Sequence, residues 1–135
     1  MVFDPAFASA LQQSYDALLG HYPAKVSDRL HLASAVGREQ AVMAIEAMRE
    51  QLITHNPLDR KTQQLVHLAM LIARNEVAAA TLHIRAAHKA GATLAELHGV
   101  AETAAVVCGM PGYSLAVDLI KPLLAEPKVV HSATT

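Results

Sequence analysis

The chain has 135 residues, a formal net charge of −1 and a hydrophobic content of 53%, which fit one globular domain. Its basic residues are scattered and form no run that would read a phosphate backbone, so no nucleic-acid partner is expected. One cysteine cannot form an intramolecular disulfide. With no signal peptide and no run of about 18 apolar residues, we expect a cytoplasmic protein without a membrane partner.

The first part of the chain predicts one clear helix followed by an ambiguous segment. Asp4 precedes Pro5, which places an N-cap acceptor before proline at the first helical position, and Gly20 is a stop signal. Beyond it, Pro23 interrupts the pattern, and only a short helix is indicated before Val36. These residues, 1–36, are interpreted as an N-terminal helical segment.

The remainder of the chain predicts a helical core over residues 37–126 and a loose tail over 127–135. Apolar residues recur at helical spacing, and no segment alternates with the period of a strand, so the predicted fold class is all-α. Thr93 and Glu96 have the spacing of a capping box. The expected helices cover residues 37–53, 60–74, 76–89, 93–109 and 111–124.

Two of these helices are too apolar for a small monomer. Residues 65–73 read LVHLAMLIA, and residues 100–109 read VAETAAVVCG. A helix that is apolar around most of its circumference must be covered on several sides, and a domain of this size cannot enclose many such helices. We therefore expect a homo-oligomer.

The histidines raise the question of a metal site. The chain has eight, but no pair at i,i+4 spacing and no His-Glu-x-x-His motif. His83 and His88 lie about 140° apart around a helix axis and do not share a face. No metal site is therefore expected.

His83 stands out because alanines surround it in the sequence and leave space beside its ring. Glu76, two turns earlier, is expected on the same helix face. A carboxylate near an imidazole orients the ring and raises its pKa, which suits general acid–base catalysis near neutral pH. On the residues alone, a structural or surface histidine remains the alternative.

The stretch from Leu58 to Gly112 contains four short motifs, which are LDRKT at 58–62, LHIRAA at 82–87, AGAT at 90–93 with Glu96 after it, and GMP at 109–111. With these motifs the stretch resembles the carboxymuconolactone decarboxylase and AhpD-like family. The resemblance implies an AhpD-like helical bundle that assembles into a trimer or hexamer, with His83 at the position of the family's active-site histidine.

The departures from the redox branch of the family favour its decarboxylase-like branch. The redox branch carries a Cys-x-x-Cys before its histidine and a relay glutamate, and here Glu76, Ala79 and Gln64 occupy those positions. The resemblance implies a cofactor-free lyase of aromatic catabolism that acts on a small carboxylated lactone or related acid. His83 would deliver the proton, and Gln64 would hold water or substrate by hydrogen bonds.

Four further side chains are candidate substrate ligands. Arg60 or Arg85 is expected to hold a substrate carboxylate bidentately. Glu102, a lone carboxylate on an apolar helix, needs a partner and faces either a pocket or an inter-subunit salt bridge. Tyr113 lies either at a pocket mouth or in an interface or core. Cys108, near a helix C-terminus, is expected to be a buried small hydrophobe.

Two other functions stay open at this point. One is a non-enzymatic oligomeric binding protein on the same fold, which the absence of a cavity beside His83 would favour. The other is an AhpD-type thiol peroxidase, which only the fold supports, because Cys108 lies outside the redox motif.

Overall fold

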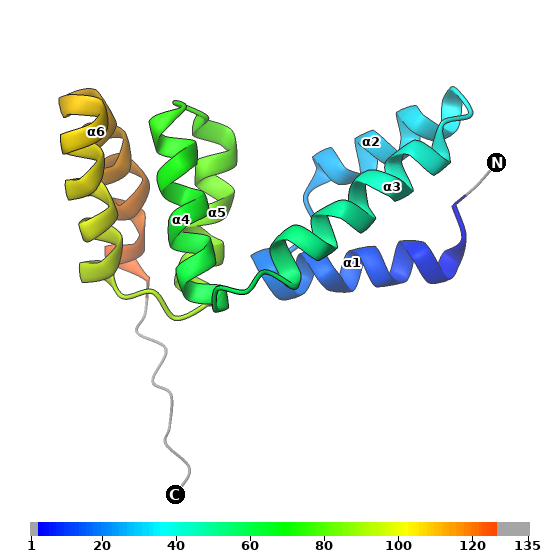
Figure 1. The fold of residues 1–135 in the computed structure, drawn as a ribbon, viewed down its shortest axis with the longest axis horizontal. Coiled ribbons are helices and arrows are strands. Elements are labelled where there is room, and N and C mark those ends of the chain that lie inside the picture. Colours follow the sequence, from blue (N-terminus) through cyan, green and yellow to red (C-terminus); the bar gives the residue numbers. More distant parts are fainter. Residues whose placement is uncertain (1–2, 127–135) are drawn as a thin grey trace, which may run out of the picture.

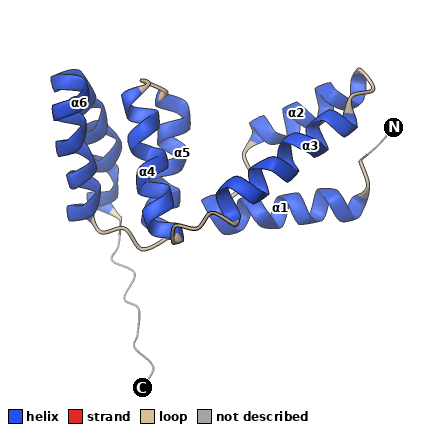
Figure 2. Ribbon diagram, viewed as in Figure 1, coloured by secondary structure: helices blue, strands red, loops and turns tan. Residues whose placement is uncertain are grey.

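The computed structural model describes residues 3–126, and this part of the chain is built of helices without any strand (Figures 1 and 2). The predicted all-α fold class is therefore confirmed. The elements are α1 (Pro5–Leu19), α2 (Ala24–Ala35), α3 (Glu39–Arg49), the π-helical turn η1 (Glu50–Thr54), α4 (Arg60–Ala73), α5 (Val77–Lys89), α6 (Leu94–Ile120) and the 3-10 turn η2 (Lys121–Ala125). The predicted loose tail, 127–135, lies outside the described residues.

The ambiguous segment after α1 forms a complete helix, α2, rather than a short one. Pro23 lies at its N-cap, where a residue without an N–H group leaves no helical hydrogen bond unmade. Gly20 ends α1 with a φ of 80°, the left-handed conformation that glycine adopts readily. The proline therefore separates two helices instead of breaking one.

The helices form two groups that meet at α5 (Figure 1). One hydrophobic cluster joins α4, α5 and α6, and the other joins α1 and α2 to the opposite side of α5. Ile84 and Ala87 belong to the first cluster, whereas Ala86 belongs to the second and Leu82 packs against it. Because both sides of α5 are covered, side chains between these faces are removed from water.

Lys89, in the last turn of α5, connects the two helix groups by hydrogen bonds to α1. Its Nζ donates hydrogen bonds to the carbonyl oxygens of Asp16 at 2.7 Å and Ala17 at 2.9 Å. Those carbonyls lie near the C-terminal end of α1, where the helix dipole favours a positive charge.

The long helix α6 reverses direction at Gly109, whose φ is 71° and ψ is −171°. His98 Nε2 lies 3.0 Å from the hydroxyl oxygen of Tyr113, although the two residues are 15 positions apart. In a straight helix this separation would be about 22 Å. The two halves are therefore antiparallel neighbours, as Figure 1 shows, and the predicted division into two helices at Gly109 is confirmed.

Much of the apolar surface of this hairpin is not buried within the chain. By length and composition, the segment Leu94–Ala125 is apolar enough to cross a membrane, and only 17% of its most apolar window is buried. Because the chain reverses at Gly109, neither half reaches the roughly 20 residues that a straight span needs. Val106, Val107 and Met110, beside the reversal, are 87%, 73% and 64% exposed.

Replacing Gly109 with alanine is expected to lower the free energy of unfolding by about 1–3 kcal/mol, because its backbone conformation is essentially restricted to glycine. Gly99→Ala is the matched control. Gly99 lies inside the same helix, with no atom near the position of an added methyl group, so alanine should be neutral or stabilise by up to about 1 kcal/mol. Urea denaturation measures the free energy of unfolding of both variants. Equal stability of the two would contradict the backbone strain expected for alanine at position 109.

Candidate functional site

A hydrogen-bonded chain of side chains links α4 to His83 on α5. Gln64, fully buried on α4, donates from Nε2 to Gln63 Oε1 at 2.5 Å. Its Oε1 lies 2.9 Å from His83 Nδ1. Since the amide nitrogen is used by Gln63, the oxygen faces the imidazole, and Nδ1 is the protonated nitrogen of the neutral ring. Nε2 then carries the lone pair and has no protein partner among the described residues.

An N-cap stabilises the first turn of α4 and so helps to position the hydrogen-bonded side chains of Gln63 and Gln64. Asp59 accepts hydrogen bonds from Thr62 N at 2.9 Å and from Thr62 Oγ1 at 2.8 Å. These bonds lower the pKa of the Asp59 carboxyl and keep it ionised at the positive end of the helix dipole. Gln64 follows directly after this first turn.

His67, one turn after Gln64, stacks on His83. The ring centroids are 3.7 Å apart and the rings are inclined by 24°. His67 Nδ1 is buried without a hydrogen-bond partner within residues 3–126. No group of three His, Cys, Asp or Glu side chains in this range is arranged to hold a metal ion.

Both stacked histidines are neutral at physiological pH. Burial, the nearby His67 and then Arg49 lower the pKa of His83 from 6.5 to about 3. Burial and then Arg49 lower the pKa of His67 as well. Burial and a neighbouring guanidinium both disfavour the protonated imidazole, because neither stabilises a positive charge on the ring.

The direction of this shift corrects the expectation that a carboxylate raises the pKa of His83. Glu76 is exposed at the N-cap of α5, and its Oε1 lies 3.7 Å from Arg74 Nη2. The predicted pairing of Glu76 with His83 is therefore wrong. A residue before the first helical turn does not follow the helical periodicity that placed it on the face of His83.

A cavity of about 160 Å³ lies beside His83, between α5 and the three N-terminal helices. Its wall is cationic: Lys25 and Arg29 are exposed on α2, and Arg49 is half-buried on α3. No acidic side chain is among its lining residues. The cavity is lined by Tyr15, Leu19, Pro23, Lys25, Val26, Arg29, Arg49, Ala79, Leu82 and His83.

Tyr15 holds Arg49 in this wall. The guanidinium carbon of Arg49 is 4.2 Å from the centroid of the Tyr15 ring, a cation–π arrangement. The Tyr15 hydroxyl donates to the Glu46 carboxylate, at 3.1 Å to Oε1 and 3.2 Å to Oε2. Burial is the main cause that raises the pKa of Tyr15, so the phenol stays neutral and remains a donor.

The arginines expected to bind a substrate carboxylate lie elsewhere. Arg85 is exposed, and its Nη1 is 2.8 Å from Glu126 Oε1. Arg60 begins α4 and is not among the residues that line the cavity. The cations that line the cavity are instead Lys25, Arg29 and Arg49, which were not predicted from the sequence.

Glu102 and Tyr113 form a separate cluster on α6. His98 Nδ1 is 3.0 Å from Glu102 Oε1, and His98 Nε2 is 3.0 Å from the Tyr113 hydroxyl. Glu102 is exposed, and Tyr113 packs against the core of α4, α5 and α6. Neither lines the cavity beside His83, so these two candidates are not brought together with it. Cys108 is half-buried near the Gly109 reversal, less buried than expected.

The buried, neutral His83 is expected to make the protein sensitive to acid. The unfolded chain takes up a proton at this side chain near pH 6.5, whereas the folded protein does so only near pH 3. The free energy of unfolding should therefore fall as the pH drops from 6.5 to about 3, by up to about 1.4 kcal/mol per pH unit. His83→Asn should reduce this slope in urea denaturation between pH 7 and 4.

His31→Asn, which removes an exposed histidine of α2, is the control and should retain the wild-type slope. His67 contributes in the same direction, so the slope of His83→Asn should be smaller without vanishing. An unchanged slope in His83→Asn would show that this histidine already titrates normally in the folded protein.

Comparison with known proteins identifies the family of the chain. Residues 39–122 match the model of the carboxymuconolactone decarboxylase family, which is more than half of the chain. Neither the curated proteins nor the solved structures that were compared include a match. The matched range contains Gln64, His67 and His83. The chain belongs to the carboxymuconolactone decarboxylase family.

Proposed function

We propose that the protein is a cofactor-free lyase that removes carbon dioxide from a small acid, such as a carboxylated lactone, whose carboxylate is activated by a nearby carbonyl group. One observation carries the proposal: His83, with a free Nε2, shares a cavity of about 160 Å³ with Lys25, Arg29 and Arg49. An anionic substrate matches the three cations, and the small volume restricts its size.

The cationic wall provides binding and stabilises the charge that develops during the reaction. Guanidinium groups hold carboxylates through paired hydrogen bonds, and Arg49 is already oriented by Tyr15. When the bond between the carboxylate and the substrate carbon breaks, carbon dioxide leaves and the electron pair delocalises onto the carbonyl oxygen. Fixed positive charges beside that oxygen lower the energy of this enolate-like state.

His83 supplies the proton that replaces the carboxylate. In the free protein its pKa is lowered to about 3, so the imidazole is neutral at pH 7. A bound anion adds negative charge beside the ring and offsets Arg49, and both changes favour protonation at Nε2. Proton uptake is thus coupled to substrate binding, and the proton then passes from Nε2 to the substrate carbon.

The sequence and the cavity weigh against the two other functions. A thiol peroxidase of the AhpD type needs two cysteines near the histidine, and the corresponding positions hold Glu76 and Ala79. Ala79 lines the cavity, so the small residue leaves space beside His83. The absence of a cavity beside His83 would favour a non-enzymatic binding protein, whereas a cavity lined by three cations lies there.

The activity test uses carboxymuconolactone and follows the loss of its absorbance. His83→Ala is expected to lower kcat by about 100-fold or more, because general acid–base catalysis contributes a factor of that order. Arg29→Gln and Arg49→Gln are each expected to raise KM about tenfold, the effect of one lost charge-assisted hydrogen bond. Binding of the substrate by wild-type protein should take up protons from a weak buffer.

Arg85→Gln is the matched control, because it removes an exposed arginine that pairs with Glu126 outside the cavity. Its kinetic constants should equal those of the wild type. If folded wild-type protein does not turn over the lactone, that substrate is excluded. If His83→Ala retains full activity, the proposed role of His83 is wrong.

We also propose that the exposed apolar tip of the α6 hairpin lies between subunits of a trimer or hexamer. Val106, Val107 and Met110 form this tip, and large exposed apolar patches mark interaction surfaces. Val107→Asp should reduce the molar mass in light scattering at micromolar concentration. Leu124→Asp, at another exposed apolar position, is the control. A monomeric wild-type protein would contradict the proposal.

A further inference from the structure

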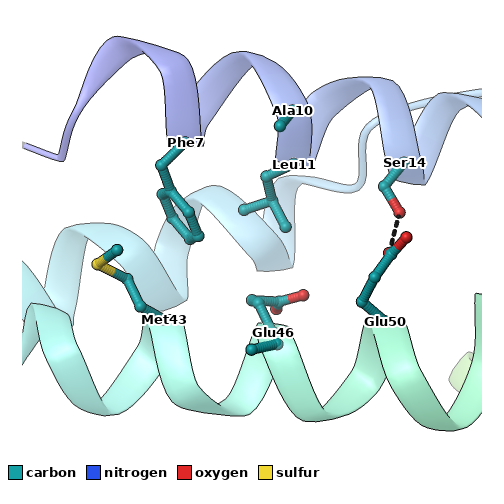
Figure 3. A pocket seen from close by; sticks show the side chains of 8 residues that line it. Phe7, Ala10, Leu11, Ser14, Met43, Glu46 and Glu50 are labelled. Atoms are coloured by element: carbon teal, nitrogen blue, oxygen red, sulfur yellow. Dashed lines mark hydrogen bonds between the residues drawn. The ribbon is translucent and has the colours of Figure 1, made fainter.

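A second and larger cavity is a groove between α1 and α3. Its volume is about 430 Å³, within the range of small-molecule sites. Figure 3 shows Phe7 and Leu11 reaching down from α1 and Met43 lying below them on α3. Glu46 and Glu50 lie on the opposite side of the groove from α1.

The two carboxylates of this groove accept hydrogen bonds from hydroxyl groups, and neither has a lysine or arginine partner among the described residues. Glu46 is 7% exposed and accepts from the Tyr15 hydroxyl. Glu50 Oε2 accepts from Ser14 Oγ at 3.0 Å and from Thr54 Oγ1 at 3.2 Å (Figure 3). A carboxylate offers about four acceptor positions, so both retain capacity. Glu50 is half-buried, and its Oε1 also lies 3.9 Å from His55 Nε2. Glu46 is buried without a cationic partner, which is costly, and a cation in the groove would relieve that cost.

The cations near this region belong to the other cavity. No lysine or arginine is among the residues that line the groove. Arg49 lies over the face of the Tyr15 ring and lines the cavity of His83. The charged residues that line the His83 cavity are therefore cationic, whereas those that line the groove are acidic.

We propose that the groove binds a small protonated amine with an apolar body, such as an arylalkylamine. The ammonium group, which has three donors and no acceptor, sits against Glu46 and Glu50. The apolar body packs on Phe7, Leu11 and Met43, where it removes exposed hydrocarbon from water. This site is distinct from the proposed lyase site, and its occupancy does not depend on turnover there.

Isothermal titration of the full-length protein with three probes of one body tests the proposal. The probes are 4-phenylbutylamine, 4-phenylbutanol and 4-phenylbutyrate. The amine should bind, the alcohol about tenfold or more weaker, and the acid without saturation. Glu46→Gln and Glu50→Gln should each weaken amine binding about tenfold, whereas Asp118→Asn, an exposed acid on α6, should leave it unchanged.

Ala47→Phe provides a second variant, because Ala47 is an exposed lining residue of α3 and a larger side chain there fills the groove without removing a buried charge. It should abolish amine binding while the circular dichroism spectrum stays unchanged. Equal binding of amine and alcohol overturns the role of the carboxylates. No amine binding overturns the proposal, and a lower molar mass of Ala47→Phe in light scattering would then identify the groove as an interface between copies.

Discussion

The sandwiching of α5 between two helix groups is the constraint on which the rest of the structure depends. Small side chains, among them Ala80, Ala86 and Ala87, let helices approach α5 from opposite sides. His83 lies between these faces and is therefore desolvated. The same packing that stabilises the fold makes its imidazole neutral, because burial is the largest contribution to the lowered pKa.

The charges around this neutral ring are arranged by side chains that carry no charge themselves. Gln64 orients His83 without offering a proton, and Tyr15 orients Arg49 through its ring while its hydroxyl bonds to Glu46. A glutamate in place of Gln64 would favour the imidazolium and bring a negative charge to a cavity lined by cations. Glutamine keeps the geometry of the hydrogen bond and leaves the positive field of the cavity intact.

The sequence predicted features that depend on local chemistry. The helix start at Pro5, the capping box of Thr93 and Glu96 and the helix end at Gly109 each follow from residues within one turn of each other. His83 and Gln64 were identified through the family resemblance, and the structure joins them by a hydrogen bond. Periodicity misplaced Glu76, because it lies before the first turn of α5.

The cationic wall was missed because it is assembled by tertiary packing. Lys25 and Arg29 lie one turn apart on α2, a spacing that signals a shared basic face but not what that face covers. Arg49 joins them from α3 only once α1 packs against α5 and brings Tyr15 into place. No local pattern records these contacts. The stacking of His67 on His83 is of the same kind, since it joins two helices.

The residues that line the His83 cavity come from two parts of the chain. His83 and Arg49 fall within the family match at residues 39–122, whereas Lys25 and Arg29 precede it. Under the proposed function, the residue that delivers the proton therefore lies inside the matched range, and two of the three cations that contact the substrate lie outside it. Substitutions in α2 alone would then change which anion binds and leave the hydrogen bond between Gln64 and His83 in place.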